Sequence, residues 1–146
     1  MTQAAQGLAV ALFSELLATD VLARNLLAAH LPKGMELNQF SVLNHLSRQT
    51  DERTPAQLAK TFNVTRGAMT NTLSRLETAG HIHIRPDWSD ARSKRVKISP
   101  AGRAACDAAI EALAPVLNKV VNQVGAENVR LALPMLRDLR ARLSAL

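Results

Sequence analysis

Residues suited to reading DNA bases share one predicted helical face between Arg66 and Arg75. An arginine can pair with guanine through two hydrogen bonds, an asparagine can pair with adenine in the same way, and a threonine offers a hydroxyl or a methyl group. This face contains no acid, and the opposite face carries Met69, Leu73 and Leu76 at helical spacing. We therefore expect DNA contacts from Thr65, Arg66, Gly67, Thr70, Asn71, Ser74 and Arg75.

Other basic residues are placed to hold the DNA backbone or to enter a groove. Lys60 and Arg75 are expected at phosphates, where contacts set the register without reading sequence. A guanidinium at a hairpin tip fits a narrow minor groove, which makes Arg92 the candidate for this contact, with Lys94 beside it. Asp90 is expected to have a structural task in the same turn, either by holding an arginine or by capping the turn.

The positive charge of the chain is concentrated in one stretch. Between Arg48 and Arg103 the sequence has eleven basic and five acidic residues, so this stretch alone carries the net charge of +6 that the whole chain has. A localised excess of this kind is expected where a protein meets a polyanion, and it favours double-stranded DNA as the partner.

The predicted elements place these residues on a pair of short helices. Thr54 and Pro55, with Gln57 three residues after the cap, predict a capped helix. Thr65 predicts the cap of the next helix, and Gly80 is expected to end it in the left-handed conformation. A helix pair of this type presents the N-terminal half of its second helix to the major groove.

A basic hairpin is expected after the helix pair. Residues 81–85 and 94–98 alternate as strands do, and the residues between them form a polar loop. Trp88, the only tryptophan, lies in this loop and is expected to anchor it on the domain, while stacking on a ribose or a base is the alternative.

Long apolar helices are predicted at both ends of the chain, at residues 4–30, 100–124 and 126–145. They are rich in leucine, valine and alanine, and the sequence outside the basic stretch is neutral. A small central module does not need this much apolar surface to cover it, so we expect these helices to leave faces for a second subunit. Packing within one monomer is the alternative.

The stretch 58–103 resembles the winged helix-turn-helix of the multiple-antibiotic-resistance regulator (MarR) family. The wing signature of that family, Asp-x-Arg followed by an apolar strand and Ser or Thr, matches Asp90 and Arg92 followed by strand 96–98 and Ser99. Further matching positions are Leu58, Ala59, Val64, Thr65, Leu73, Leu76, Glu77, Gly80 and Gly102. The specific match covers about a third of the chain.

The resemblance implies a mainly α (α+β) fold in which residues 36–99 form a winged helix-turn-helix DNA-binding domain. Residues 1–35 and 100–146 would form a helical dimerisation region. It implies a homodimer that binds a pseudo-palindromic operator and acts as a transcriptional regulator, in most cases a repressor. It also implies release by a small-molecule effector, and the candidate lining residues are Phe13, Leu17, Phe40, Leu43 and Ile110.

Two alternatives to an effector-released regulator remain open at this point. A redox-responsive regulator of the same fold would use Cys106, but this cysteine lies on an apolar helical stripe and is expected to be buried and inert. A non-specific architectural DNA-binding protein would need Lys-rich tails or apolar wedges more than capped, rigid helices.

Other function classes find little support in the sequence. No glycine-rich phosphate loop, nucleophile elbow or paired acids indicate an enzyme, and the four scattered histidines do not predict a metal site or cofactor. The N-terminal apolar stretch lacks a basic leader and is interrupted by Glu15 and Asp20, so we expect a cytoplasmic protein with no membrane span.

Overall fold

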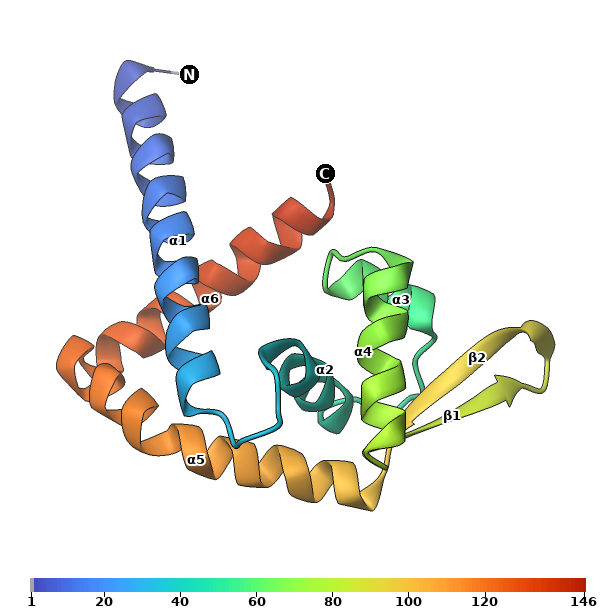
Figure 1. Ribbon diagram of the computed structural model, residues 1–146. Helices are drawn as coiled ribbons and strands as arrows, with labels where there is room; N and C mark the ends of the chain where they lie inside the picture. The colour runs from blue at the N-terminus through green and yellow to red at the C-terminus, as the bar shows by residue number, and fades with distance from the viewer. Residues whose placement is uncertain (1) are drawn as a thin grey trace. The chain divides into compact units, whose positions relative to one another are not determined.

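The computed structural model describes residues 2–146, without the side chain of Ala91, and shows a mainly helical chain with one hairpin (Figure 1). The elements are α1 (Gln3–His30), α2 (Leu37–Ser47), α3 (Pro55–Thr61), α4 (Arg66–Thr78), β1 (Ile82–Asp87), β2 (Asp90–Ile98), α5 (Pro100–Val124) and α6 (Ala126–Ser144). They divide into two compact units, one ending at Ala112 and one comprising Leu113–Leu146. The expected mainly helical fold with a small sheet is confirmed.

Helix α4 lies at the centre of the hydrophobic core of the first unit. Its inner residues Met69, Leu73 and Leu76 are buried, as the spacing predicts. They share one cluster with buried residues of α2, α3, the two strands and the first turns of α5, namely Val42, Leu43, Leu46, Leu58, Ala59, Ile82, Val96, Ile98 and Cys106. This cluster fixes which face of α4 remains at the surface.

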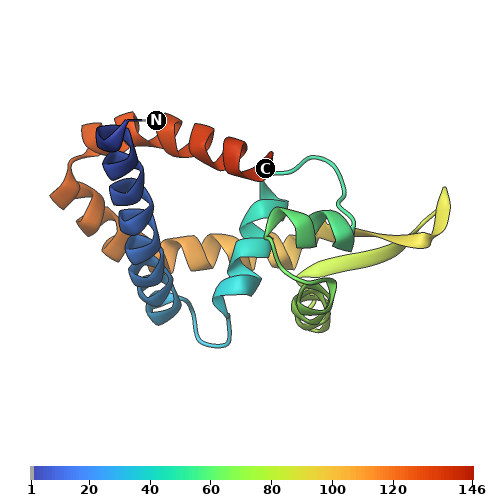
Figure 2. The same cartoon turned by 90° about the horizontal axis from the view of Figure 1, so that it is seen from above.

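Strands β1 and β2 form an antiparallel hairpin, called the wing below, that projects from the helices (Figure 2). Pairing runs from Ile82 with Ile98 to Pro86 with Lys94, and a register shift follows at Asp87. The strands are longer than the sequence pattern predicts, because pairing continues through Pro86 to the tip. The predicted polar loop is therefore a tight turn.

The start of α2 differs from the prediction. The pattern places the N-cap at Asn38, whereas the helix begins at Leu37 and is capped by Glu36. The reason is a capping box, in which the side chain of Gln39 accepts a hydrogen bond from the backbone N–H of Glu36 at 2.8 Å.

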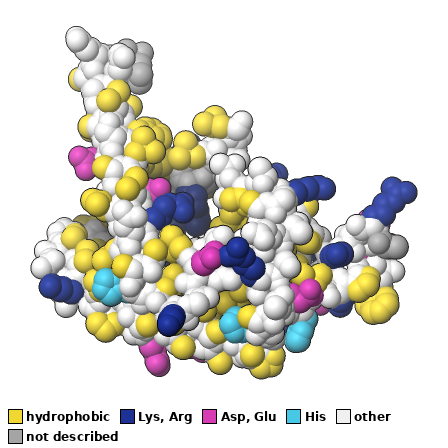
Figure 3. Space-filling model, viewed as in Figure 1, with side chains coloured by type: hydrophobic (Ala, Val, Ile, Leu, Met, Phe, Trp, Pro, Cys, Tyr) yellow, Lys and Arg dark blue, Asp and Glu magenta, His cyan; other side chains and the backbone are white. Residues whose placement is uncertain are grey.

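Helix α1 has no buried residue within the described chain. Its exposed apolar side chains, shown along its surface in Figure 3, include Leu8, Val10, Phe13, Leu17, Val21 and Leu22. By length and composition alone, α1 is also the one described helix that is long and apolar enough to cross a membrane. The helix therefore leaves a large apolar surface unaccounted for within one chain.

The second unit contains the end of α5 and the whole of α6. Pro134 lies inside α6, and the helix continues through it from Ala126 to Ser144 although a proline removes one backbone hydrogen bond. No residue of α6 is buried, and its exposed apolar side chains are Leu131, Leu133, Met135, Leu136 and Leu143.

Candidate nucleic-acid interface

Helix α4 presents the predicted base-reading residues at the surface. The Thr65 hydroxyl caps the helix by accepting the backbone N–H of Ala68 at 3.1 Å, and the buried inner face turns the other side outward. The predicted residues on this outer side are all exposed: Arg66, Gly67, Thr70, Asn71, Ser74 and Arg75. The cap leaves the first turn of α4 rigid and uncovered, as a recognition helix requires.

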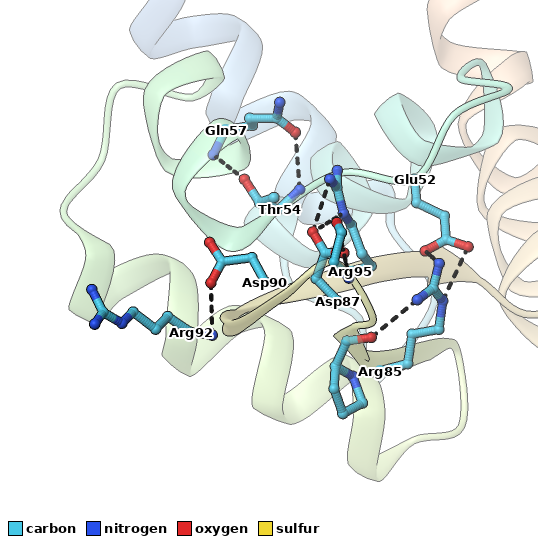
Figure 4. A network of polar contacts seen from close by, with 10 residues as sticks. Glu52, Thr54, Gln57, Arg85, Asp87, Asp90, Arg92 and Arg95 are labelled. Carbon is cyan, nitrogen blue, oxygen red and sulfur yellow. Dashed lines mark hydrogen bonds and ion pairs between the residues drawn. The ribbon is translucent and has the colours of Figure 1, made fainter.

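A reciprocal capping box fixes the start of helix α3. The Thr54 hydroxyl accepts the backbone N–H of Gln57 at 3.1 Å, and the Gln57 side chain accepts the backbone N–H of Thr54 at 3.0 Å (Figure 4). The turn to α4 contains Asn63 in the left-handed conformation, at φ 51°. Lys60 is exposed on α3, where a phosphate contact is expected.

The tip of the wing is built around Asp87. Its carboxylate accepts hydrogen bonds from the backbone N–H and the hydroxyl of Ser89, at 3.0 and 2.7 Å, and pairs with the Arg95 guanidinium at 3.0 Å. The hydrogen bonds from Ser89 lower the pKa of Asp87, and the bond and charge of Arg95 lower it further. The Asp87 side chain is only 11% exposed. Asp87 therefore holds the neighbouring arginine, which was one of the two tasks expected for Asp90.

Asp90 instead caps the turn, which is the second role expected for it. Its carboxylate accepts the backbone N–H of Arg92 at 3.0 Å, an Asx-type bond. Figure 4 shows the Arg92 side chain extended away from this network, with its guanidinium clear of the carboxylates drawn. The charge of Arg92 thus remains available for a DNA contact.

The base of the wing is fastened to the segment before α3. Arg85 pairs with Glu52 at 2.9 Å (Figure 4), and the backbones of Arg53 and Val96 exchange hydrogen bonds at 3.2 and 2.7 Å. Because Arg53 immediately precedes the cap of α3, the wing and the helix pair are held in one arrangement. Arg85 and Arg95 are consequently occupied by protein carboxylates.

Four of the predicted DNA-binding residues line one cavity of about 390 Å³, called the reading cavity below. Arg66 and Thr70 come from the first turns of α4, and Arg92 and Lys94 from β2. The start of α3 and the wing complete the wall with Thr54, Pro55, Ala56 and Ser93. These last four residues are not among those expected at the interface from the sequence, although the cap signal at Thr54 predicts the start of α3 correctly.

Arg75 has a partner that the sequence did not indicate. Its guanidinium Nη1 lies 2.6 Å from Glu36 Oε1, and both side chains are about half exposed. Glu36 is 39 residues away in the sequence and also caps α2. Local spacing cannot reveal such a pair, which forms only when α2 packs beside α4.

The five predicted effector residues do not gather around the cavity that the structure shows behind α4. Leu43 is fully buried in the core and Phe40 is packed against it, whereas Phe13, Leu17 and Ile110 are exposed. A cavity of about 460 Å³, called the α2–α4 cavity below, is lined by none of the five. Its wall is formed by Arg24 of α1, by the first half of α2, by Phe62 and Val64, and by Ala68, Met69 and Thr72 of α4.

Redox and metal chemistry receive no structural support. Cys106 is buried in the core as expected, and burial raises the pKa of its thiol, which disfavours the reactive thiolate. Within residues 2–146, no three histidine, cysteine or acidic side chains cluster in a way that could hold a metal ion.

A family model described as the MarR family matches residues 33–93, which include α2, α3, α4 and most of the wing. Among curated proteins, the transcriptional activatory protein BadR of Rhodopseudomonas palustris is 34% identical over 73 residues, covering 49% of this chain and 42% of BadR. The multiple antibiotic resistance protein MarR of Salmonella typhimurium is 37% identical over 76 residues, or 52% of each chain. The chain thus spans about half the length of the curated relatives it matches.

Solved structures extend the similarity over the whole chain. The transcriptional regulator BldR from Sulfolobus solfataricus has a TM-score of 0.82 and 27% identity, covering 97% of this chain and 99% of BldR. A mutant MarR from E. coli in complex with operator DNA has a TM-score of 0.71 and 26% identity, covering 86% of this chain and 91% of that protein. Together, the family model over residues 33–93, the curated relatives and these structures show that the chain is similar to MarR-family regulators.

Proposed function

We propose that this protein is a homodimeric, sequence-specific DNA-binding transcriptional regulator that represses transcription and is released by a small-molecule effector. The observation that carries the proposal is the reading cavity, where Arg66 and Thr70 of α4 converge with Arg92 and Lys94 of the wing. Helix α4 would lie in the major groove and the wing tip would enter the adjacent minor groove. The complex of an E. coli MarR mutant with operator DNA, a protein 26% identical to this chain, supports this function.

Each candidate residue then has a separate role. Arg66, Thr70 and Asn71 read base edges, with Gly67 and Ser74 allowing close approach, and Thr65 fixes the start of the helix. Lys60, Arg75 and Lys94 hold phosphates, and Arg92 probes the minor groove. Arg85 and Arg95 are assigned no DNA contact, because their partners Glu52 and Asp87 are only 28% and 11% exposed, whereas both side chains of the Arg75–Glu36 pair are about half exposed.

The apolar faces at both ends of the chain support the proposed dimer. Helices α1 and α6 have no buried residues but carry rows of exposed leucine and valine. Exposed apolar rows of this length are costly in water, and a second copy of the chain can cover them. A dimer also matches two half-sites of a pseudo-palindromic operator, spaced by about one helical turn of roughly 10 base pairs.

The α2–α4 cavity is the site we propose for the effector. It is lined mainly by apolar side chains and reaches the inner face of α4 at Ala68 and Met69. A ligand that displaces α4 from the core would move the base-reading residues and lower the affinity for DNA. Repression is the proposed sign of regulation, because a dimer spanning two half-sites occludes the DNA it covers.

Selection of bound duplexes from a random-sequence library tests the proposal. We expect enrichment of one pseudo-palindromic sequence, which excess random duplex then fails to displace. If no sequence is enriched, or random DNA competes equally, the protein is a non-specific architectural DNA-binding protein. Transcription in vitro from a promoter carrying the selected site then distinguishes repression from activation.

A further inference from the structure

The basic residues of the central stretch do not all serve the reading cavity. Along β2, Lys97 lies on the opposite side from Arg92 and Lys94, because successive side chains alternate. Arg48 is the C-cap residue of α2, and Arg103 lies in the first turn of α5. Arg48, Lys97 and Arg103 line a separate hollow of the first unit.

This hollow, called the α2–α5 cavity below, has a volume of about 510 Å³. The end of α2 and the loop 49–52 form one wall, and Val96, Lys97 and Ile98 of β2 form another. Arg103 of α5 completes the lining, and the side chains of Leu46 and Val96 lie buried at its floor. The volume is within the range of sites that bind small molecules, roughly 300–1,000 Å³.

The cations of the α2–α5 cavity outnumber its available acids. Arg48, Lys97 and Arg103 form no ion pair within the described part of the chain. Of the two lining carboxylates, Glu52 is turned to Arg85 at 2.9 Å (Figure 4), which leaves Asp51 alone to balance three positive charges.

One neutral donor lies beside these cations, and one of the cations is held in place by a backbone carbonyl. The side-chain oxygen of Gln49 already accepts a hydrogen bond from the Arg53 guanidinium, so its amide N–H groups are the ones left to donate. Arg103 Nη1 donates to the backbone carbonyl of Ser47 at 3.3 Å, which holds the guanidinium at the end of α2 while its other N–H groups remain unpartnered among the described residues. The cavity thus offers donors and positive charge to one ligand.

We propose that the α2–α5 cavity binds a small molecule through its phosphate group. Two guanidinium groups and an ammonium group match a dianionic phosphate, because guanidinium N–H groups pair with its oxygens two at a time. The cavity, at about 510 Å³, is larger than a phosphate ion, which leaves room for the organic part of a phosphorylated compound. This proposal does not depend on DNA binding, since the reading cavity uses different residues.

Isothermal titration of the full chain with inorganic pyrophosphate tests the site, with ionic strength held constant by potassium chloride. We expect saturable binding of one pyrophosphate per chain, and Lys97→Ser and Arg48→Ser should each weaken it roughly tenfold or more. Lys119→Ser, which removes an exposed lysine outside the first unit, is the matched control and should bind as the parent chain does. Thermal unfolding of each variant shows whether it is folded.

Two results would overturn the proposal. One is the absence of saturable heat from the folded parent chain, and the other is equal weakening by Lys119→Ser. A second titration, with random-sequence duplex DNA, separates the possible sources of the phosphate. If Lys97→Ser and Arg48→Ser weaken duplex binding while pyrophosphate does not bind, these cations contact the DNA backbone and the small-molecule site is wrong. Arg92→Ala should weaken duplex binding and leave pyrophosphate binding unchanged.

Discussion

The central winged helix and the terminal helices differ in whether they bury their apolar side chains within the chain. Helix α4 buries four residues in a closed core, and its start is capped by a hydroxyl. Helices α1 and α6 are longer, yet neither buries a residue within the described chain. The central part carries a core of its own, whereas the terminal helices leave apolar surface exposed, which the proposed dimer would cover.

The largest expected effect is on assembly. Replacing Leu133 and Leu136 of α6 with glutamate places two charges in the proposed dimer interface, and the dimer dissociation constant should rise roughly a hundredfold or more. Sedimentation or light scattering measures the change. Arg137→Glu, on the same helix, is the control. A double variant that remains dimeric at low concentration would show that α6 does not hold the dimer.

The next largest effect concerns the core of the central part. A Cβ atom at Gly102 would lie 2.0 Å from the backbone carbonyl oxygen of His81, so Gly102→Ala must push the start of α5 away from the wing. Chemical denaturation should show a loss of about 1–3 kcal/mol or more. Gly67→Ala meets nothing closer than 4.0 Å and should be neutral or slightly stabilising. Equal losses in the two variants would contradict the packing argument.

A smaller effect is predicted for DNA affinity alone. Arg92→Ala should weaken operator binding by about 1–3 kcal/mol and leave the unfolding free energy unchanged, because the side chain is exposed. Fluorescence anisotropy with the selected operator measures the affinity, and Arg137→Ala controls for the loss of one positive charge. Unchanged affinity at physiological salt would remove Arg92 from the interface.

The smallest effect is a pH dependence in the wing. The pKa of Asp87 is lower in the folded chain, so its stabilising contribution is present above the ordinary value of 3.8 and is lost as the pH falls through the folded pKa. Asp87→Asn should therefore be less stable than the parent chain at neutral pH, and the difference should shrink in acid. Denaturation at several pH values, with Asp51→Asn as the control, measures it. A difference that is constant with pH would argue against this role.

Local signals explain which features could be predicted from sequence. The capping box of Thr54 and Gln57, the Thr65 cap and the positive φ of Gly80 depend on residues at most three positions apart, and all three predictions are confirmed. The alternating pattern of the wing was also recognised, although its exact length depends on pairing beyond Pro86.

Features that depend on distant residues were missed. The pairs Arg75–Glu36 and Arg85–Glu52 join residues 39 and 33 positions apart, and charge alone does not select one carboxylate among many.

Trp88 was expected to anchor the wing, but its side chain is 85% exposed. That prediction is wrong because the indole ring at the wing tip is exposed to solvent and is not packed on the domain.

The pair between Arg75 and Glu36 has a consequence for how salt affects DNA binding. A free arginine that meets a phosphate displaces one condensed cation from the duplex, which steepens the salt dependence of affinity by nearly one unit. If Arg75 moves from Glu36 to a phosphate, the exposed carboxylate left behind attracts a cation from solution. The two exchanges oppose each other, so Arg75 should add less to the salt slope than Lys60, which has no such carboxylate among the described residues.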